Sequence, residues 1–288
     1  ILAERYDNMV AWVEYMHRQE PEELRFGTGF HFGDWVALDT MVDGNVFGAT
    51  DVELIGTAYF AYSPDILAKT ARVLGRQADA QQYTDLHRRI VAYFQSEFLT
   101  PSGRLASNTQ TAYILALTFG LLPEEQRAEA ARRLVENIRG RGTQLVTGFL
   151  GTPYLCYALS QNGYLDVAYE LLLREEYPSW LFPVKQGATT IWERWDGIKA
   201  DGSFQNPGMN SFNHYAYGAI GEWMVRFVAG LDVDPANPGF ARAVVAPKLG
   251  GGFTSAQASF ESINGVYAVD WKLADGVMHL SVTAPANG

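Results

Sequence analysis

The stretch VAGLDVDPANPG, residues 228–239, separates two kinds of hydrophobic periodicity. Before Gly230, apolar residues recur every three to four positions, which is typical of amphipathic helices. After it, β-forming residues alternate or cluster in short runs, which is typical of strands. The two prolines between Asp232 and Gly239 predict a linker at the change. We therefore expect a helical domain over residues 1–230 and a small antiparallel β domain, resembling a β-sandwich, over residues 231–288.

Upstream of Gly230, the periodicity predicts about eight helices joined by short connections, which is an antiparallel α/α arrangement. Ser63-Pro64 has the form of an N-cap followed by proline at the first helical position. We therefore expect one helix to end and another to begin there. Ser107 and Gln110 fit a capping box at the start of a further helix.

The last helix and the β tail flank the linker. Asn210 or Ser211 is expected to cap that helix, which continues to residue 228. Downstream, Asn264-Gly265 and Asp275-Gly276 predict two-residue hairpin turns. The strands around these turns are predicted over residues 244–245, 256–263, 266–273 and 277–283. Because the tail has no cluster of acids or metal ligands, we expect it to serve packing.

Composition and charge argue against several classes of function. Of 288 residues, 48% are hydrophobic and 19% are charged, which is ordinary for a soluble globular protein. A formal net charge of −10 argues against binding to nucleic acid or to an anionic membrane surface, since both rely on Lys and Arg. Cys156 is the only cysteine, so it leaves the compartment open, with the cytoplasm slightly preferred. The chain has no dinucleotide, phosphate-loop or zinc motif, and we expect no cofactor and no metal.

The first candidate site is a loop rich in aromatic residues and carboxylates, GATTIWERWDG at residues 187–197. It lacks helical or strand periodicity, which predicts an ordered loop, and such loops often line binding sites. The flat face of a residue such as Trp192 suits the C–H face of a sugar, and a neighbouring carboxylate can activate water. The alternative is a surface turn whose two indoles fill the core, and the pattern alone leaves both open.

The second candidate is FGTGFHFGDW, residues 26–35, which combines glycines, aromatic residues and an acid. Small residues allow the backbone to turn sharply and to come close to a ligand. The alternative here is an aromatic loop that seals one end of a helical core. His214 is a further candidate, because it follows the first loop and lies at the predicted first turn of the last helix.

Several long motifs occur together and in order along the chain. They are FGDW (32–35), ELIGTAYFAYS (53–63), TQTAYILAL (109–117), TGFLGTPYL (147–155), YPSWLFPVKQGATT (177–190), GATTIWERWDG (187–197) and GSFQNPGMNSFNHYAYGAIGEW (202–223). This set resembles the catalytic region of inverting α-L-rhamnosidases, and the tail after Pro235 resembles the β domain that closes those enzymes. The resemblance covers nearly the whole chain. It implies an (α/α)6 barrel, in which six helical hairpins form a ring with the sugar bound at one end.

The resemblance also implies that the chain is part of a longer protein. The family's barrel has twelve helices, whereas about eight are predicted here. The family's general acid lies in an Arg-Asp-Glu-Arg-like segment upstream of the first predicted helix, and these 288 residues contain no such segment. Ile1 is not a methionine and already lies in helical phase. We therefore expect a partial barrel without its N-terminal helices, and little activity from this chain alone.

Roles carry over from the family residue by residue. Glu193 matches the general base that deprotonates the attacking water, Trp35 an aromatic wall of the sugar subsite, and His214 a histidine that hydrogen-bonds the sugar. Asp34 is carried over beside Trp35 as a substrate-binding residue. Trp192, next to Glu193, is a further candidate for substrate binding. Asp34, Trp35, Glu193 and His214 are expected to converge at one end of the helical array.

The implied partner is a rhamnose-containing glycoside or oligosaccharide. Because missing helices would leave apolar faces uncovered, we also expect self-association, or pairing with the missing N-terminal segment. Three alternatives stay open. The enzyme can act on another sugar; Asp34 or Asp196 can supply the acid; or the chain can be a non-catalytic carbohydrate-binding or structural fragment.

Overall fold

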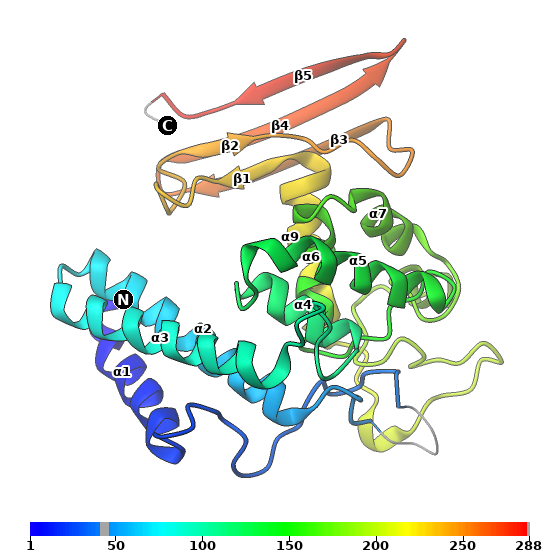
Figure 1. The fold of residues 1–288 in the computed structure, drawn as a ribbon. Coiled ribbons are helices and arrows are strands. Elements are labelled where there is room, and N and C mark those ends of the chain that lie inside the picture. Colours follow the sequence, from blue (N-terminus) through cyan, green and yellow to red (C-terminus); the bar gives the residue numbers. More distant parts are fainter. Residues whose placement is uncertain (41–45, 287–288) are drawn as a thin grey trace. The chain divides into compact units, whose positions relative to one another are not determined.

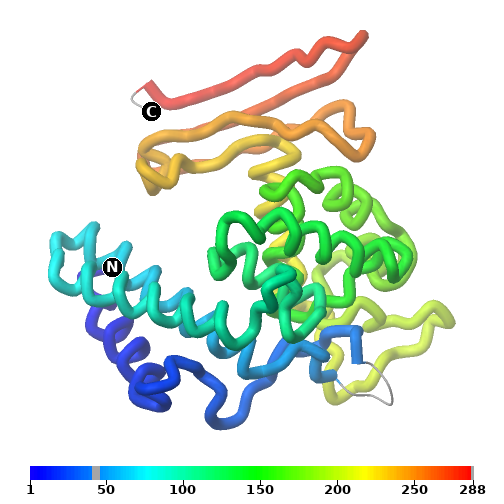
Figure 2. The backbone as a smooth tube through the Cα atoms, viewed as in Figure 1, coloured from blue at the N-terminus to red at the C-terminus, as the bar shows by residue number. Residues whose placement is uncertain are grey.

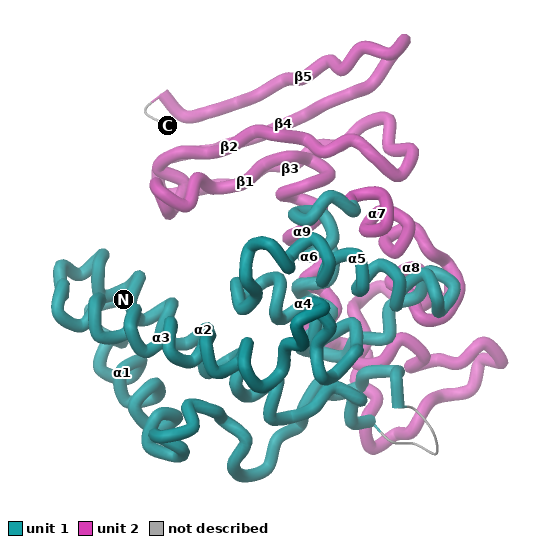
Figure 3. Tube along the Cα trace, viewed as in Figure 1, with its two compact units in different colours: residues 1–164 teal, residues 165–288 magenta. Residues whose placement is uncertain are grey.

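The helices before residue 164 lie in the segments where the apolar periodicity predicts them, with one predicted break absent. A computed structural model describes residues 1–40 and 46–286, and the chain divides into two compact units, residues 1–164 and 165–288 (Figure 3). The described part of the first unit contains α1 (Leu2–Gln19), α2 (Val52–Val73), α3 (Gln77–Phe98), α4 (Gln110–Thr118), α5 (Glu124–Gly140) and α6 (Thr152–Gln161). Figure 1 labels these elements.

The core of the first unit is built from apolar stripes on these helices. The stripe of α3 consists of Tyr83, Leu86, Ile90, Phe94 and Phe98, which are all buried and confirm the predicted face. Helix α4 is apolar on every side and is buried from Gln110 to Leu117, because α2, α5 and α6 all pack against it. An all-round apolar helix is stable in water only when it is enclosed in this way.

The prediction of a helix break at Ser63-Pro64 is wrong, because α2 runs through both residues. The Ser63 hydroxyl donates to the Tyr59 carbonyl oxygen at 2.8 Å instead of capping a new helix. A proline inside a helix costs about 3 kcal/mol. Burial of Phe60 and Leu67, which are both 0% exposed, contributes about 1.5–3 kcal/mol for each side chain and outweighs that cost.

The predicted capping box at Ser107 and Gln110 is also wrong. The side chain of Thr109 caps α4 by accepting from the Ala112 N–H at 3.3 Å. The Ser107 hydroxyl instead accepts from the backbone N–H of Asp51 at 3.0 Å. The buried Gln110 amide bonds a distant segment, donating to the Gln144 carbonyl at 2.9 Å and accepting from the Val146 N–H at 3.0 Å. Partners remote in sequence therefore displace the local cap.

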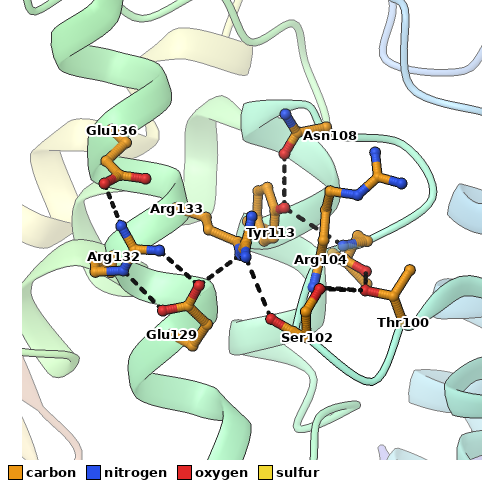
Figure 4. Close-up of polar contacts among 10 residues, drawn as sticks. Thr100, Ser102, Arg104, Asn108, Tyr113, Glu129, Arg132, Arg133 and Glu136 are labelled. Carbon is orange, nitrogen blue, oxygen red and sulfur yellow. Dashed lines mark hydrogen bonds and ion pairs between the residues drawn. The ribbon is translucent and has the colours of Figure 1, made fainter.

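Polar contacts also tie the loop before α4 to helix α5 (Figure 4). The Arg133 guanidinium donates to the Ser102 carbonyl oxygen at 3.3 Å and lies 2.8 Å from the Glu129 carboxylate. The Tyr113 hydroxyl donates to the Asn108 side chain at 2.7 Å. Because ion pairs near the surface contribute about 0–1 kcal/mol each, these contacts orient the loop more than they stabilise it.

The second unit begins with short helices. Its described helical segments are α7 (Leu165–Leu173), α8 (Leu181–Lys185), the 3-10 turns η1 (Pro207–Met209) and η2 (Ala216–Ala219), α9 (Ile220–Trp223) and the π-helical η3 (Met224–Ala229). The last helix therefore begins at Ala216, and the predicted cap at Asn210 or Ser211 is wrong. The carbonyl oxygen of Ser211 instead accepts from the Glu193 N–H at 2.9 Å.

The described part of the β tail, residues 231–286, has five strands in two antiparallel sheets. They are β1 (Leu231–Val233), β2 (Ala243–Val245), β3 (Ser255–Ser262), β4 (Gly265–Ala274) and β5 (Val277–Thr283). Strands β1 and β2 form one sheet, and the other has the order β3-β4-β5 (Figure 1). The first strand lies in part of the predicted linker, because Leu231 is buried and pairs with Val245.

One of the two hairpin turns is as predicted. Ala274 pairs with Val277, which leaves Asp275-Gly276 as the turn, with φ angles of +53° and +76°. The other turn is shifted by one residue. Gly265 is already paired with Ser262, so the turn residues are 263 and 264 rather than 264 and 265.

The two sheets share one core with the end of η3. Leu231 from the first sheet packs with Tyr267 and Val269 from the second and with Ala229. The Trp271 indole N–H donates to the Val228 carbonyl oxygen at 2.9 Å, and the chain passes directly from η3 into β1 (Figure 2). The predicted fold class, mainly helical with an antiparallel β tail, is confirmed. Along residues 1–40 and 46–286, no helix is long and apolar enough to cross a membrane.

Candidate active site

The loop at residues 187–197 is irregular, as predicted, and the backbone of residues 211–214 fastens it. The Glu193 N–H donates to the Ser211 carbonyl oxygen at 2.9 Å, and the His214 N–H donates to the Ile191 carbonyl oxygen at 2.8 Å. These two bonds lie on both sides of Trp192 and join the loop to residues 211–214. The position of Glu193 is therefore fixed by main-chain bonds rather than by side-chain packing alone.

The Glu193 side chain is half-buried and turns back to the same segment. Its Oε2 atom accepts from the Ser211 N–H at 2.8 Å. Among the described residues this is the one hydrogen bond to the carboxylate, so Oε1 remains able to accept a proton. A carboxylate that is held at one oxygen and not bonded at the other has a geometry that suits a general base.

Asp196 is held differently from Glu193. Its Oδ1 atom lies 3.2 Å from the Arg194 Nε atom, and its Oδ2 atom accepts from the Gln205 amide at 2.5 Å. The Arg194 side chain is itself nearly buried, at 7% exposed. Because both oxygens of Asp196 serve this internal pairing, Asp196 is poorly suited to protonate a leaving group.

The two tryptophans of the loop fill its core. Trp195 stacks on Tyr217 with ring centroids 3.9 Å apart, and Trp192 packs edge-on against Phe212 at 5.1 Å. Trp192 is 5% exposed and Trp195 is 3% exposed. The interpretation of the indoles as core residues is therefore correct for both rings, while Glu193 between them keeps access to solvent.

His214 is half-buried and lies two residues before η2, rather than inside the last helix.

The second loop is organised by the buried side chain of Asp34. This carboxylate is 0% exposed and accepts from the N–H groups of Gly148 at 2.8 Å, Leu150 at 2.8 Å and Gly151 at 3.2 Å. The Thr111 hydroxyl is a fourth donor. Burial raises the pKa of the Asp34 carboxyl, while the hydrogen bonds from these four donors act in the opposite direction.

Trp35 follows Asp34 directly and is half-buried. Its ring makes edge-on contacts with Phe32 at 5.2 Å and with Phe47 at 4.9 Å. Phe32 is 59% exposed and makes a further edge-on contact with Phe30, which is 73% exposed. Exposed aromatic groups of this size suit a ligand with apolar faces.

A hollow of about 350 Å³ adjoins the aromatic side chains of the second loop. Its walls come from α1, α2, the loop itself and Leu150, and they are Trp12, Met16, Phe26, His31, Phe32, Gly33, Ile55, Gly56, Tyr59, Ser63 and Leu150. Its volume falls in the range of small-molecule sites. The lining is mostly aromatic and aliphatic, with few polar groups.

The sequence interpretation assigned no role to several residues that build these loops. The Ser211 N–H holds Glu193, while Thr111 and Gly148 hold Asp34. A signal was present, because all three lie within motifs shared with the resembled family. A backbone donor cannot be recognised from its side chain, so its role became visible only in the fold. The expected convergence of the two loops stays a prediction.

Comparison with known families places the chain in one class of glycosidase. Residues 1–228 match the family described as bacterial alpha-L-rhamnosidase 6 hairpin glycosidase domain, and residues 230–288 match the bacterial alpha-L-rhamnosidase C-terminal domain. The chain belongs to this family.

Three relatives make the likeness specific. An alpha-L-rhamnosidase of Streptomyces avermitilis is 42% identical over 287 residues, which are 100% of this chain and 26% of the relative. The crystal structure of Streptomyces avermitilis alpha-L-rhamnosidase complexed with L-rhamnose superposes with a TM-score of 0.92 at 41% identity, covering 99% of this chain and 26% of that one. The crystal structure of the native alpha-L-rhamnosidase of Aspergillus terreus gives a TM-score of 0.93 at 34% identity, and the match covers 99% of this chain and 33% of that one. The chain thus spans about a quarter to a third of the length of these relatives.

Proposed function

We propose that the protein containing this chain hydrolyses terminal α-L-rhamnosides with inversion, and that Glu193 is the general base. The observation that carries the proposal is the Glu193 carboxylate, which is held by the Ser211 N–H through one oxygen and is open at the other. Inverting hydrolysis needs such a carboxylate to deprotonate water, on the sugar face opposite to the acid. Family membership and the L-rhamnose bound to the Streptomyces relative support rhamnose as the sugar.

The other site residues are proposed with roles that their environments support. Trp35, which is half-buried, is proposed as the wall against the apolar face of the sugar, and His214 as a hydrogen-bond donor to a hydroxyl. Trp192 is nearly buried, so we propose that it supports the Glu193 loop from beneath. We retain the division into a catalytic domain at residues 1–230 and a β domain at residues 231–288.

We propose that the general acid comes from outside these 288 residues. The two carboxylates considered as alternatives within the chain are both occupied. Asp34 accepts four hydrogen bonds in a fully buried position, and Asp196 is paired with Arg194 and Gln205. An acid must reach the leaving oxygen directly or through one water. Neither group is arranged to do so.

The proposal is tested with two proteins and an aryl α-L-rhamnoside. The protein expressed from its complete reading frame should release rhamnose, and proton NMR at early times should show the β anomer first. The 288-residue chain alone should release little, because it lacks the acid. Rapid hydrolysis by the 288-residue chain would contradict an external acid, and early release of the α anomer would contradict inversion. Absence of rhamnoside hydrolysis, with turnover of another glycoside, would favour a different sugar.

We also propose that the 288-residue chain associates with itself through strand β5. The strand is an edge of its sheet, is exposed along its length and carries no acidic or lysine residue. Met278, Leu280 and Val282 lie on the same sheet face as Trp271 and remain 38%, 42% and 51% exposed. An uncharged apolar edge readily pairs with a second strand.

Sedimentation velocity of the 288-residue chain is expected to show dimers or larger species that Leu280→Lys shifts toward monomer. A charge buried in a strand pairing is costly, so the new lysine should oppose that pairing. The same change makes the formal net charge of −10 one unit less negative and so weakens general repulsion between chains, which therefore cannot explain the shift. Gln257→Lys, on the strand at the other edge of the same sheet, is the matched control and should keep the association. Monomeric wild-type chain at tens of micromolar would exclude the proposal.

A further inference from the structure

We propose that Asp34 is a positioning residue, whose buried carboxylate sets the orientation of Trp35 without touching the sugar. This inference rests on the proposed role of Trp35 as a wall of the sugar subsite. It changes the part that Asp34 plays, from a contact with substrate to a clamp beneath the residue that makes the contact.

The clamp joins three segments that are distant in sequence. Asp34 lies in the second loop, Thr111 lies in α4, and Gly148, Leu150 and Gly151 belong to the turn that enters α6. All four donors to the carboxylate come from the last two segments. Three of them are backbone N–H groups, which cannot accept a hydrogen bond. An ionised carboxylate therefore satisfies every one of them. In an asparagine at this position, the side-chain NH2 group would lie against at least one backbone N–H, and two donors cannot bond each other.

The same turn touches the main chain of Trp35 directly. The Phe149 N–H donates to the Trp35 carbonyl oxygen at 2.9 Å, and the Leu38 N–H donates to the Val146 carbonyl oxygen at 2.8 Å. A Cβ atom added to Gly148 would lie only 2.1 Å from the Trp35 carbonyl oxygen, so the two backbones pack too closely for any residue with a side chain at position 148. Any movement of the turn is thus transmitted to the backbone that carries the indole.

The residue after Trp35 shows that this part of the loop is held under strain. Val36 has φ of +63°, a left-handed conformation that β-branched residues avoid, and it is buried. Its N–H donates to the Val46 carbonyl oxygen at 2.7 Å, and the Ala37 N–H donates to the Asp34 carbonyl oxygen at 3.1 Å. Such conformations persist only where surrounding structure imposes them. The hydrogen bonds of the Asp34 carboxylate are part of that surrounding structure, beside the bond from Val36 to Val46.

Direct contact between Asp34 and a sugar would need a free oxygen at the surface. The side chain is 0% exposed, and each oxygen already accepts two hydrogen bonds from the protein. Trp35, one residue further, is half-buried and keeps part of its surface accessible to solvent. The buried Asp34 carboxylate is therefore suited to hold the backbone, and the partly accessible Trp35 indole is suited to contact the sugar.

The test is a double-mutant cycle in the protein expressed from its complete reading frame, using an aryl α-L-rhamnoside as substrate and L-rhamnose as inhibitor. Trp35→Ala should raise KM and the inhibition constant of L-rhamnose about two- to tenfold, the usual worth of one aromatic contact. Asp34→Asn should raise both constants in the same direction. In the Trp35→Ala background, however, Asp34→Asn should raise them no further, because its effect acts through the indole.

Each outcome of the cycle has its own meaning. Effects that multiply would mean that Asp34 contacts the sugar independently, and a lower apparent kcat with unchanged KM would mean a purely structural role; either result overturns the inference. If Trp35→Ala itself leaves both constants unchanged, the proposed function of Trp35 fails instead. Thr111→Val removes one donor and keeps the carboxylate, so it serves where Asp34→Asn does not fold, with a smaller rise in KM expected. If Trp35→Ala raises KM but a folded Thr111→Val variant leaves KM unchanged, that result also contradicts the proposed role of Asp34.

Discussion

Glu193→Gln is expected to lower kcat on an aryl α-L-rhamnoside by about 10²–10⁴-fold in the protein expressed from its complete reading frame. Glutamine has the same shape, and its amide oxygen can still accept from the Ser211 N–H, which lies 2.8 Å from the native carboxylate. It cannot take a proton from water, so the attacking nucleophile stays weak. Binding of the sugar does not depend on that proton transfer, and KM should change by only a few-fold.

Added azide gives this prediction a chemical control. Azide is a nucleophile that needs no base, so it should restore turnover of Glu193→Gln and yield the β-glycosyl azide. Glu222→Gln is the matched variant, because Glu222 is an exposed glutamate of α9 that pairs with Arg226 at 2.7 Å. It should keep kcat within about twofold. Retention of more than a tenth of wild-type kcat by Glu193→Gln would remove Glu193 from the base role.

The elements that the sequence predicts correctly are those whose signal is local and repeated. The face of α3 from Tyr83 to Phe98 and the strands around Asp275-Gly276 each contain several residues that agree on one period. Burial then follows, because an apolar stripe has to be covered wherever it lies. The loop around Glu193 was recognisable for the opposite reason, since its aromatic residues show no period.

The errors lie at positions where a distant partner decides the local structure. Ser63 and Pro64 read as a helix start, yet burial of the helix on both sides keeps α2 continuous. Ser211 reads as a cap, yet its backbone pairs with Glu193. Local capping contributes about 1 kcal/mol, which a single buried side chain exceeds.

Asp34 shows the same limit within the candidate site. Its place beside Trp35 in the sequence indicated a shared role at the sugar, and only the fold reveals that its carboxylate turns inward to Thr111 and Gly148. Aspartate in a glycine- and aromatic-rich loop has the same sequence signature whether it faces a ligand or the core. The distinction depends on donors more than 70 residues away in the chain.

Gly230→Ala is expected to reduce the free energy of unfolding by about 3–5 kcal/mol, which is a large share of the 5–15 kcal/mol of a typical domain. Gly230 ends η3 with φ of +83°, and an L-residue in that conformation costs about 1–2 kcal/mol. A Cβ atom there would also lie 2.2 Å from the nitrogen and 2.4 Å from the Cα atom of Pro247. These are backbone atoms, so the contact cannot be relieved by turning a side chain.

Relief would require movement of the segment that joins the helix to the sheets. The Ala246 N–H donates to the Gly230 carbonyl oxygen at 2.8 Å, and the Lys248 N–H donates to the Phe227 carbonyl oxygen at 2.8 Å. Both bonds would lengthen if Pro247 moved away. Leu231, which follows directly, would then lose its place beside Tyr267 and Val269 in the shared core. The cost therefore includes core packing as well as strain.

Urea unfolding of the two glycine variants separates this explanation from a general intolerance of alanine. Gly221 lies nine residues earlier on the exposed side of α9, and apart from its chain neighbours and the backbone of its own helix no atom lies within 4 Å of the Cβ position. Gly221→Ala should be neutral or stabilising by up to about 1 kcal/mol, because alanine is the better helix former. A loss below about 1 kcal/mol in Gly230→Ala would contradict the close contact with Pro247. Only Gly230 combines a left-handed backbone with a neighbouring main chain, so the two variants should differ. Equal losses in the free energy of unfolding would instead indicate that the helix as a whole does not tolerate alanine.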